Sequence, residues 1–212
     1  MCLIKQRAKN PEQKALRRKQ ILDATRKRFQ TLSYEEVNLN HVAADVGITK
    51  AALYRYFRNK ETLFLALFVE TLNELVIFSE QALHQEMLVQ IPLAKLITNT
   101  LLANPIYCKL SAILHTILER NLTLEEATDF KQELLRLTGL YSQLLSEHPE
   151  LKKKSNSYSV ISLLMQIQQS LIGVWHMAHP TGAIAEVIES PPLNIFKQDF
   201  EVSLLAHIEK LI

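Results

Sequence analysis

A short run of side chains around residue 50 carries the groups that proteins use to read DNA bases. Lys50 and Arg55 can donate hydrogen bonds to the guanine acceptors of the major groove. Ala51 and Ala52, which lie between them, are small enough to let a helix approach the base edges. We predict that these residues form a base-reading face, the alternative being that the two cations only keep a surface helix solvated.

Two further residues are suited to holding the phosphate backbone. Tyr54 and Lys60 supply a phenol at the end of this segment and an ammonium group near the start of the next. Such groups can contact adjacent phosphates, and the positive end of a helix adds to the attraction. The alternative for Tyr54 is packing between helices. The other DNA-contacting residues that we predict are Asn38, Asn40, Thr49 and Tyr56.

The residues around this run have the spacing of two short helices joined by a tight turn. Val42, Ala43 and Val46 fall on one face of a first helix, and Gly47 provides the permissive backbone that a sharp turn needs. Thr49 can then cap a second helix. This order of elements is typical of a helix-turn-helix, whose second helix enters the major groove.

A longer set of residues extends this motif in both directions. The second helix ends in Leu-Tyr-x-Tyr-Phe, and a lysine follows after two intervening residues. Over residues 17–65 the chain resembles the TetR family of transcriptional regulators. It departs from the family pattern at Ser33, usually glycine, and at Val37, where a hydroxyl that could contact a phosphate is missing. The residues that carry the resemblance are Ile21, Leu22, Ala24, Phe29, Tyr34, Leu53, Tyr54, Tyr56, Phe57, Lys60 and Leu63.

The resemblance implies a dimeric regulator, most often a repressor, that binds a palindromic DNA operator. A small effector bound in the C-terminal half would change the separation of the two DNA-reading heads and release the operator. Family members pair through their last two long helices, which corresponds here to the apolar segments 158–178 and 195–212. The predicted dimer-interface residues are Leu163, Ile167, Leu171, Val174, Phe200, Leu204 and Ile208.

Composition predicts an all-α fold. The 212 residues are 48% hydrophobic, contain only 4 glycines and lack sustained period-two alternation. We expect an N-terminal three-helix domain, residues 1–62, joined by a long helix to a C-terminal helical bundle, residues 63–212. Helix-breaking and capping residues place the expected helices at 11–32, from Asn59 to beyond Leu83, and at 92–102, 105–120, 124–147, 155–178 and 194–211.

Charge is distributed unevenly along the chain. Residues 1–60 contain 14 Lys and Arg against 5 Asp and Glu, whereas residues 61–212 contain 10 against 17. A basic N-terminal third suits a phosphate backbone, and an acidic remainder does not. Two distant cysteines, Cys2 and Cys108, and the lack of a signal-peptide core or a membrane span lead us to expect a cytoplasmic protein.

Polar and aromatic groups set within apolar helices of the C-terminal half indicate a ligand pocket. Because the surrounding residues are mostly Leu and Ile, we expect an apolar or aromatic effector. The predicted ligand-binding residues are Tyr107, Ser111, His115, Tyr141, Gln166, Gln169 and Trp175.

Two other classes of protein remain as alternatives. One is a ligandless or protein-controlled DNA-binding adaptor, whose C-terminal half serves only for assembly. The other is a small helical enzyme, but the sequence contains neither a G-x-S-x-G elbow nor a glycine-rich phosphate loop. His176 and His179 have a spacing that could hold a metal, but no carboxylate or thiol partner is evident in the sequence. We therefore expect no catalytic residues, cofactor or metal.

Overall fold

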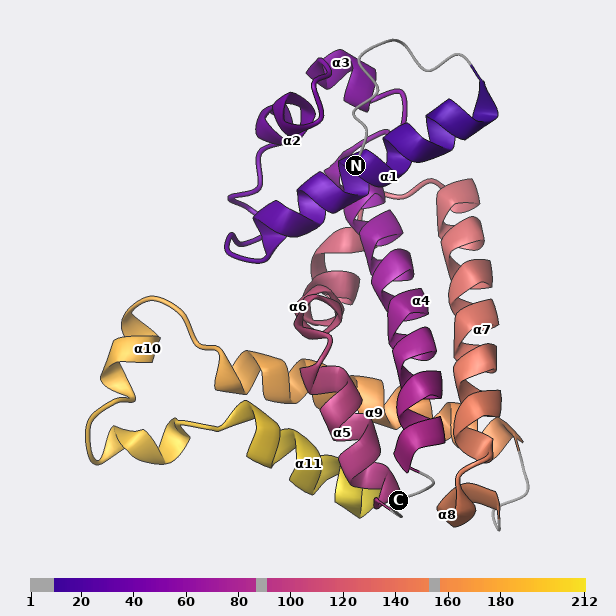
Figure 1. Cartoon of the computed structure of the whole chain (residues 1–212). Coiled ribbons are helices and arrows are strands. Elements are labelled where there is room, and N and C mark those ends of the chain that lie inside the picture. Colours follow the sequence, from indigo (N-terminus) through magenta and orange to yellow (C-terminus); the bar gives the residue numbers. More distant parts are fainter. Residues whose placement is uncertain (1–9, 87–90, 153–156) are drawn as a thin grey trace.

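The computed structural model describes residues 10–86, 91–152 and 157–212, and all regular elements in these ranges are helical. This confirms the all-α fold, with a helix-turn-helix head and a C-terminal helical bundle (Figure 1). The elements are α1 (Pro11–Phe29), α2 (Leu39–Asp45), α3 (Lys50–Leu53), α4 (Lys60–Glu86), α5 (Leu93–Leu102), α6 (Pro105–Ile113), the π-helix η1 (Leu114–Leu118), α7 (Leu124–Ser146), α8 (Pro149–Lys152), α9 (Ser157–Ala178), α10 (Ala183–Val187), the 3-10 helix η2 (Leu193–Phe196) and α11 (Phe200–Leu211).

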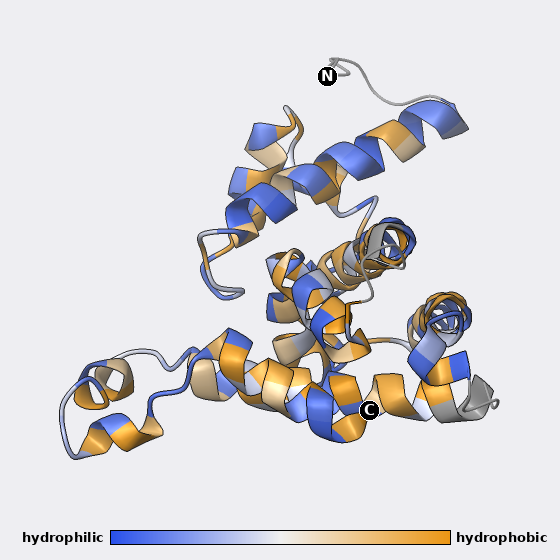
Figure 2. Ribbon diagram, turned by 60° about the horizontal axis from the view of Figure 1, so that its bottom comes forward, coloured by the Kyte–Doolittle hydropathy of each residue, from blue (hydrophilic) through white to orange (hydrophobic). Residues whose placement is uncertain are grey.

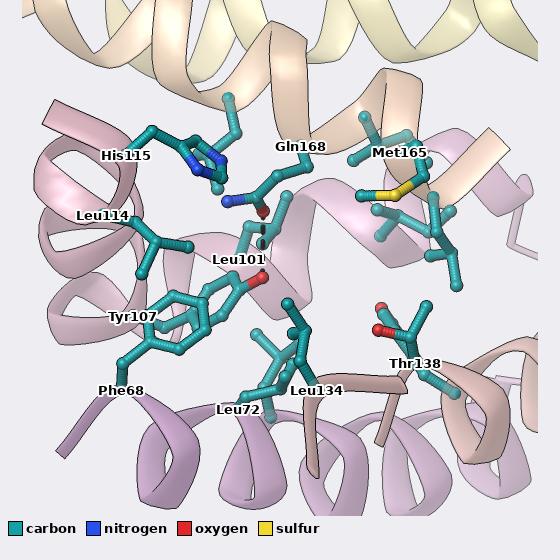
Figure 3. A pocket seen from close by; sticks show the side chains of 16 residues that line it. Phe68, Leu72, Leu101, Tyr107, Leu114, His115, Leu134, Thr138, Met165 and Gln168 are labelled. Carbon is teal, nitrogen blue, oxygen red and sulfur yellow. Dashed lines mark hydrogen bonds between the residues drawn. The ribbon is translucent and has the colours of Figure 1, made fainter. Parts of the chain in front are cut away.

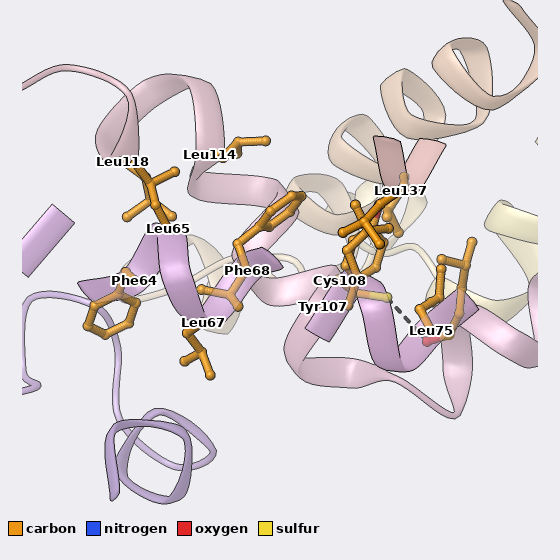
Figure 4. Close-up of a cluster of buried hydrophobic side chains, with 14 of the residues drawn as sticks. Phe64, Leu65, Leu67, Phe68, Leu75, Tyr107, Cys108, Leu114, Leu118 and Leu137 are labelled. Carbon is orange, nitrogen blue, oxygen red and sulfur yellow. Dashed lines mark hydrogen bonds between the residues drawn. The ribbon is translucent and has the colours of Figure 1, made fainter. Parts of the chain in front are cut away.

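Helix α4 connects the head to the bundle, and its aromatic residues pack on both. Phe64 meets Phe29 and Tyr34 of the head edge to face, with ring centroids 5.1 and 4.9 Å apart. One turn later Phe68 lies against Tyr107 of α6, at 5.4 Å between centroids. Figure 4 shows Phe64, Phe68 and Tyr107 within one apolar cluster. Phe29 belongs to the same cluster, and Tyr34 packs against it. The head and the bundle therefore share a continuous core along α4.

Helices α4 and α7 run from the head toward a layer formed by α9 and α11, which lie across their far ends (Figure 1). Helix α9 packs against α6, α7 and α11, and α11 also packs against α5. By length and composition, Lys60–His84 could cross a membrane, but half of its apolar window is buried within the described structure. That pattern fits the core helix of a bundle.

Two helix ends differ from the predicted positions, one beside a long-range contact and one at a local cap. The first helix ends at Phe29. There the Lys109 ammonium of α6 caps the helix by donating hydrogen bonds to the carbonyls of Phe29 and Leu32, each at 2.9 Å. The last helix begins at Phe200, where the Asp199 carboxylate accepts from the backbone N–H of Val202 at 2.9 Å. The preceding residues form the separate turn η2 instead.

The expected helix at 105–120 changes character at Leu114. It continues as the π-helix η1, a wide turn that occurs often at functional sites. Helix α7 begins with the predicted capping box, in which Thr123 and Glu126 satisfy each other's backbone N–H groups. Helix α8 was not expected, and its Glu150 carboxylate accepts from the backbone N–H of Leu93 at the start of α5.

Candidate nucleic-acid interface and interior cavity

The turn between α2 and α3 has the geometry that the sequence predicted. Gly47 adopts φ of 67°, a left-handed conformation that favours glycine. The backbone N–H of Ile48 donates to the Ala43 carbonyl at 2.9 Å and closes the turn. The side chains of Asn38 and Thr49 cap α2 and α3 by accepting from Asn40 N and Ala52 N, at 2.8 and 3.1 Å.

Helix α3 is only four residues long and continues as turns to Phe57. Leu53 and Phe57 are buried in the head, which fixes the opposite side of this segment toward solvent. Among the predicted DNA-contacting residues, Ala52, Tyr56 and Lys60 are half-buried, and the other predicted residues are exposed. Those exposed residues are Asn38, Asn40, Thr49, Lys50, Ala51, Tyr54 and Arg55.

The two predicted phosphate-contacting residues, Tyr54 and Lys60, differ in exposure and in their contacts within the chain. The Tyr54 ring is 41% exposed, and the Lys50 ammonium lies 5.8 Å from its centroid. Lys60, in contrast, donates to the Glu35 carbonyl at 3.3 Å and sits 4.3 Å from the Tyr34 ring centroid. Partial burial lowers the pKa of Lys60. Lys60 must therefore exchange some of these contacts if it is to hold a phosphate.

Several basic residues of α1 are engaged within the chain, so the basic balance of the N-terminal segment overstates the charge available to DNA. The buried Arg17 guanidinium donates to the Val46 carbonyl at 2.7 Å, at the end of α2. Arg28 makes a bidentate pair with Asp45, at 2.6 and 2.8 Å. Arg26 pairs with acidic residues of α4. These contacts fix α2 and α4 against α1, and no local pattern in the sequence indicates the partners.

An apolar cavity lies inside the bundle, with a volume of about 70 Å³. Its walls come from α4, α5, α6, η1, α7 and α9 (Figure 3). The apolar lining comprises Phe68, Leu72, Leu75, Ile97, Leu101, Leu114, Leu134, Leu164, Met165, Ile167 and Leu171, and the polar or phenolic groups are Tyr107, His115, Thr138, Tyr141 and Gln168.

The cavity contains an unused hydrogen-bond donor. The Tyr107 hydroxyl donates to the Gln168 Oε1 atom at 2.9 Å, which orients the amide (Figure 3). The Gln168 Nε2 atom is buried, and no group among the described residues accepts its hydrogen bonds. Burial also raises the pKa of Tyr107, so its hydroxyl stays protonated. A ligand with an acceptor oxygen could satisfy the free amide N–H.

The structure brings together only part of the predicted ligand-binding set. Tyr107, His115 and Tyr141 line the cavity. Ser111 is buried but does not line it, and Gln166 and Gln169 lie on the exposed face of α9, so those three assignments are wrong for this cavity. Of the three neighbouring glutamines, only Gln168 lies on the inward-facing side of α9, and it lines the cavity.

Trp175 also lies outside the cavity. Its ring stacks on His179 at 4.0 Å between centroids and meets Phe200 of α11 at 5.3 Å. His115 is exposed at the cavity edge, and its Nδ1 atom lies 3.0 Å from Glu119 Oε2. The aromatic cluster therefore joins α9 to α11, and His115 marks the cavity rim.

The predicted dimer-interface side chains face the interior of their own chain. Leu171, Leu204 and Ile208 are fully buried, and Phe200 is half-buried against Trp175. The prediction is wrong for Leu171, Leu204 and Ile208, because one apolar stripe on each helix packs α9 and α11 against the rest of the bundle. The same holds for Leu163, Ile167 and Val174, which are also buried. Phe200 stays a prediction, since part of its side chain is exposed.

A polar cluster ties the end of the head to the bundle. The Arg58 guanidinium makes a bidentate pair with Glu126 of α7, both contacts at 2.7 Å, and donates to the Asn121 carbonyl at 2.6 Å. The Asn121 amide donates to Glu61 at the start of α4. Arg58 and the Thr123 backbone lower the pKa of Glu126 to about 2. Asn121 follows η1 in the chain, so the cluster lies close to one wall of the cavity.

Comparisons with known proteins cover both parts of the chain. The family model described as bacterial regulatory proteins, tetR family, matches residues 21–67, and the model described as tetracyclin repressor-like, C-terminal domain, matches residues 66–212. The HTH-type transcriptional repressor Rv1474c of Mycobacterium tuberculosis (strain ATCC 25618 / H37Rv) is 36% identical over 53 residues, which span 25% of this chain and only 28% of the relative.

Solved structures match almost the full length at low sequence identity. The fatty acid degradation regulator FadR from Bacillus halodurans has a TM-score of 0.55 at 16% identity, over 97% of this chain and 96% of that one. A TetR transcriptional regulator from Rhodococcus sp. RHA1 has a TM-score of 0.52 at 16% identity, over 95% and 97% of the two chains. At this identity the similarity concerns the fold alone.

Proposed function

The chain belongs to the tetR family of bacterial regulatory proteins, and from that premise we propose that it is a repressor released from a palindromic operator by a small effector. Regulators of this family are non-enzymatic proteins that bind DNA and act as dimers. The observation that carries the proposal is the combination of an exposed base-reading face with an apolar cavity that holds a free amide donor.

DNA recognition is assigned to the exposed side of α3 and the turn that follows it. Lys50 and Arg55 read base edges, and Ala51 permits close approach in the major groove. Tyr54 and Asn40 hold the backbone beside them. In a two-fold dimer the half-sites lie about one helical turn, ~34 Å, apart or slightly more.

The effector is a mainly apolar molecule with one hydrogen-bond acceptor. Leucine and isoleucine side chains suit the apolar part, and the Gln168 Nε2 atom provides the single specific contact that an acceptor oxygen needs. The described residues that line the cavity include no Lys or Arg, so a highly anionic ligand would lose hydration without compensation.

Effector binding must widen the cavity. A volume of 70 Å³ is far below the ~300 Å³ or more that drug-sized ligands occupy. The π-helix η1 carries Leu114 and His115 of the cavity wall and leads directly to Asn121, which contacts Arg58 and Glu61. We assign the coupling between effector and DNA to this path. Widening the cavity would displace η1, and Asn121 would transmit the displacement to Arg58 and Glu61, where the head joins α4.

The small cavity also favours one alternative function. A ligandless adaptor, in which the bundle serves only for assembly, requires no cavity larger than the present one. The two functions differ in their response to compounds, because an effector must lower operator affinity and the operator must lower effector affinity by the same factor.

The test begins with selection of bound fragments from genomic DNA, followed by a thermal-shift screen of apolar compounds that carry a carbonyl, ether or hydroxyl oxygen. Hits are titrated against the operator complex by fluorescence anisotropy. A five-fold or larger loss of operator affinity supports the repressor function. Specific operator binding with no compound able to shift it identifies the adaptor, and equally weak binding to every fragment rejects both.

A further inference from the structure

A groove with a volume of about 590 Å³ lies over α4, between α1 of the head and α7 of the bundle. Figures 1 and 2 show α1 crossing near the head end of α4 and α7 running beside α4. We call this hollow the lateral groove, and its lining residues lie within 18–22, 62–73 and 122–136. Its volume is within the ~300 to 1,000 Å³ that small-molecule sites occupy.

The floor of the lateral groove is apolar and partly open to solvent. Ala66 and Val69, one turn apart on α4, are half-buried, whereas Leu67 and Phe68 on the core side of the helix are buried. An apolar molecule in the groove would shield this floor from water, which is favourable. The apolar residues that line the groove are Leu22, Leu65, Ala66, Val69, Leu122 and Phe130.

The charged groups around this floor are mainly acidic. Among the described residues that line the groove, four carry a carboxylate and two carry a guanidinium group. A hollow lined by an excess of one sign of charge attracts ligands of the opposite sign. The lateral groove therefore suits a cation better than an anion. The carboxylates are Glu70, Glu126, Asp129 and Glu133, and the cations are Arg18 and Arg136.

Asp129 differs from the other carboxylates of the groove. It is exposed, and no cation among the described residues pairs with it. Arg18, on the α1 side, lies 4.9 Å from the Phe57 ring centroid. An added cation therefore has one available carboxylate, on α7. The other three are already paired, Glu70 with Lys19 and Arg26, Glu126 with Arg58, and Glu133 with Arg136.

We propose that the lateral groove is a second ligand site, distinct from the interior cavity, that binds a small organic cation with an apolar or aromatic body. The ammonium group pairs with Asp129. The body lies on Ala66 and Val69 of α4 and beside Phe130 of α7. A neutral analogue gains only the apolar contacts, and an anionic analogue is repelled by Asp129.

The position of the groove gives the bound cation a structural consequence. Leu22 belongs to the head, and Asp129 and Phe130 belong to the bundle, so one ligand contacts both parts of the chain. Such a ligand favours the arrangement of head and bundle described above over any arrangement that moves α1 away from α7. The inference depends neither on the effector proposed for the interior cavity nor on DNA binding.

The first test compares three probes that share one body. Monodansylcadaverine has a fluorescent naphthalene body and a terminal ammonium group, and the matched compounds end in an acetamide or a carboxylate. In fluorescence titrations of the full chain at low salt, the amine should bind at least about five-fold more tightly than the acetamide, and the carboxylate should bind most weakly. Raising the salt concentration should narrow these differences, because salt screens exposed charges.

The second test locates the probe with two substitutions. Asp129→Asn should bring the amine and acetamide affinities to within about two-fold of each other. The matched control is Glu125→Gln, an exposed carboxylate on the same helix that does not line the groove, and it should keep the preference. Ala66→Met places a longer side chain on the floor and should weaken all three probes at least about five-fold. Circular dichroism should show unchanged helical content in each variant.

Each contrary result overturns the inference. Absence of saturable binding by the amine removes the site, and equal binding of the three probes removes its preference for cations. Tighter binding of the carboxylate would make Arg18, instead of Asp129, the recognising group. A preference that survives Asp129→Asn, or binding that survives Ala66→Met, would place the probe outside the lateral groove. No DNA enters these titrations, so failure of this inference and failure of the proposed repressor function are separate results.

Discussion

The DNA-reading face and the interior cavity are built in opposite ways. The predicted DNA-contacting residues come from one segment, residues 38–60, and lie on α2, α3, the adjoining turns and the first residue of α4. The cavity wall is assembled from six elements between α4 and α9. A groove-reading surface needs one short helix with an exposed side, whereas a cavity must be enclosed from several directions. The local spacing of residues can therefore locate a groove-reading surface, but it cannot show which residues line a cavity.

The two regions also differ in how their polar groups are satisfied. The exposed side chains of Lys50, Tyr54 and Arg55 face solvent and can exchange water for DNA. The Gln168 amide is enclosed, and its Nε2 atom has no acceptor among the described residues. An unsatisfied buried donor costs free energy. One correct hydrogen bond to a ligand should therefore add more binding free energy in the cavity than on the solvated surface.

The largest effect should come from a charge in the bundle core. Leu204→Glu places a carboxylate where the native side chain has no exposure, and we expect a loss of more than about 4 kcal/mol in the free energy of unfolding. Thermal unfolding followed by circular dichroism measures it. The control is Val202→Glu, on the same helix but 67% exposed. A folded but monomeric Leu204→Glu protein would mean that Leu204 faces a partner subunit.

On the head, Lys50→Ala and Arg55→Ala should each weaken binding to the cognate operator by about 1 to 3 kcal/mol and relax specificity at one base position. Tyr54→Phe is the comparison, because loss of a phosphate contact weakens all sequences alike. Anisotropy titrations on cognate and scrambled duplexes at fixed salt measure both effects. Equal losses on the two duplexes would remove Lys50 and Arg55 as base readers.

Breaking the link between the two regions should have an intermediate effect. Arg58→Ala removes the contacts with Glu126 and Asn121. We expect the coupling free energy between effector and operator to fall by about 0.5 to 2 kcal/mol. Operator affinity without effector should change less. Arg136→Ala, which breaks a pair within α7, is the matched control. An unchanged coupling free energy would place the path elsewhere.

The smallest effect is expected at the cavity. Gln168→Met keeps the side-chain volume and removes the amide, so effector affinity should fall by about 1 kcal/mol, the usual contribution of one hydrogen bond. Isothermal titration calorimetry measures it, and Gln169→Met on the exposed face is the control. If both substitutions act alike, Gln168 does not contact the effector.

Several features could be predicted from the sequence because their causes are local. Gly47 is in a left-handed conformation, and Asn38, Thr49 and the pair Thr123 and Glu126 cap helices, as their types and spacing indicated. Each of these contacts spans four residues or fewer. The helical fold class and the family were accessible for the same reason, since both follow from periodicity and a compact motif.

Tertiary structure alone decided which face of each long helix points inward. The apolar stripes of α9 and α11 were visible in the sequence, but stripes that pack inside one chain and stripes that pair two chains have the same periodicity. Contacts between distant segments resolved this: Leu171 and Leu204 are buried within the bundle, and Gln168 faces the cavity while Gln169 faces solvent. A sequence records the spacing of side chains along a helix, and only the packing of the other helices determines which direction is the interior.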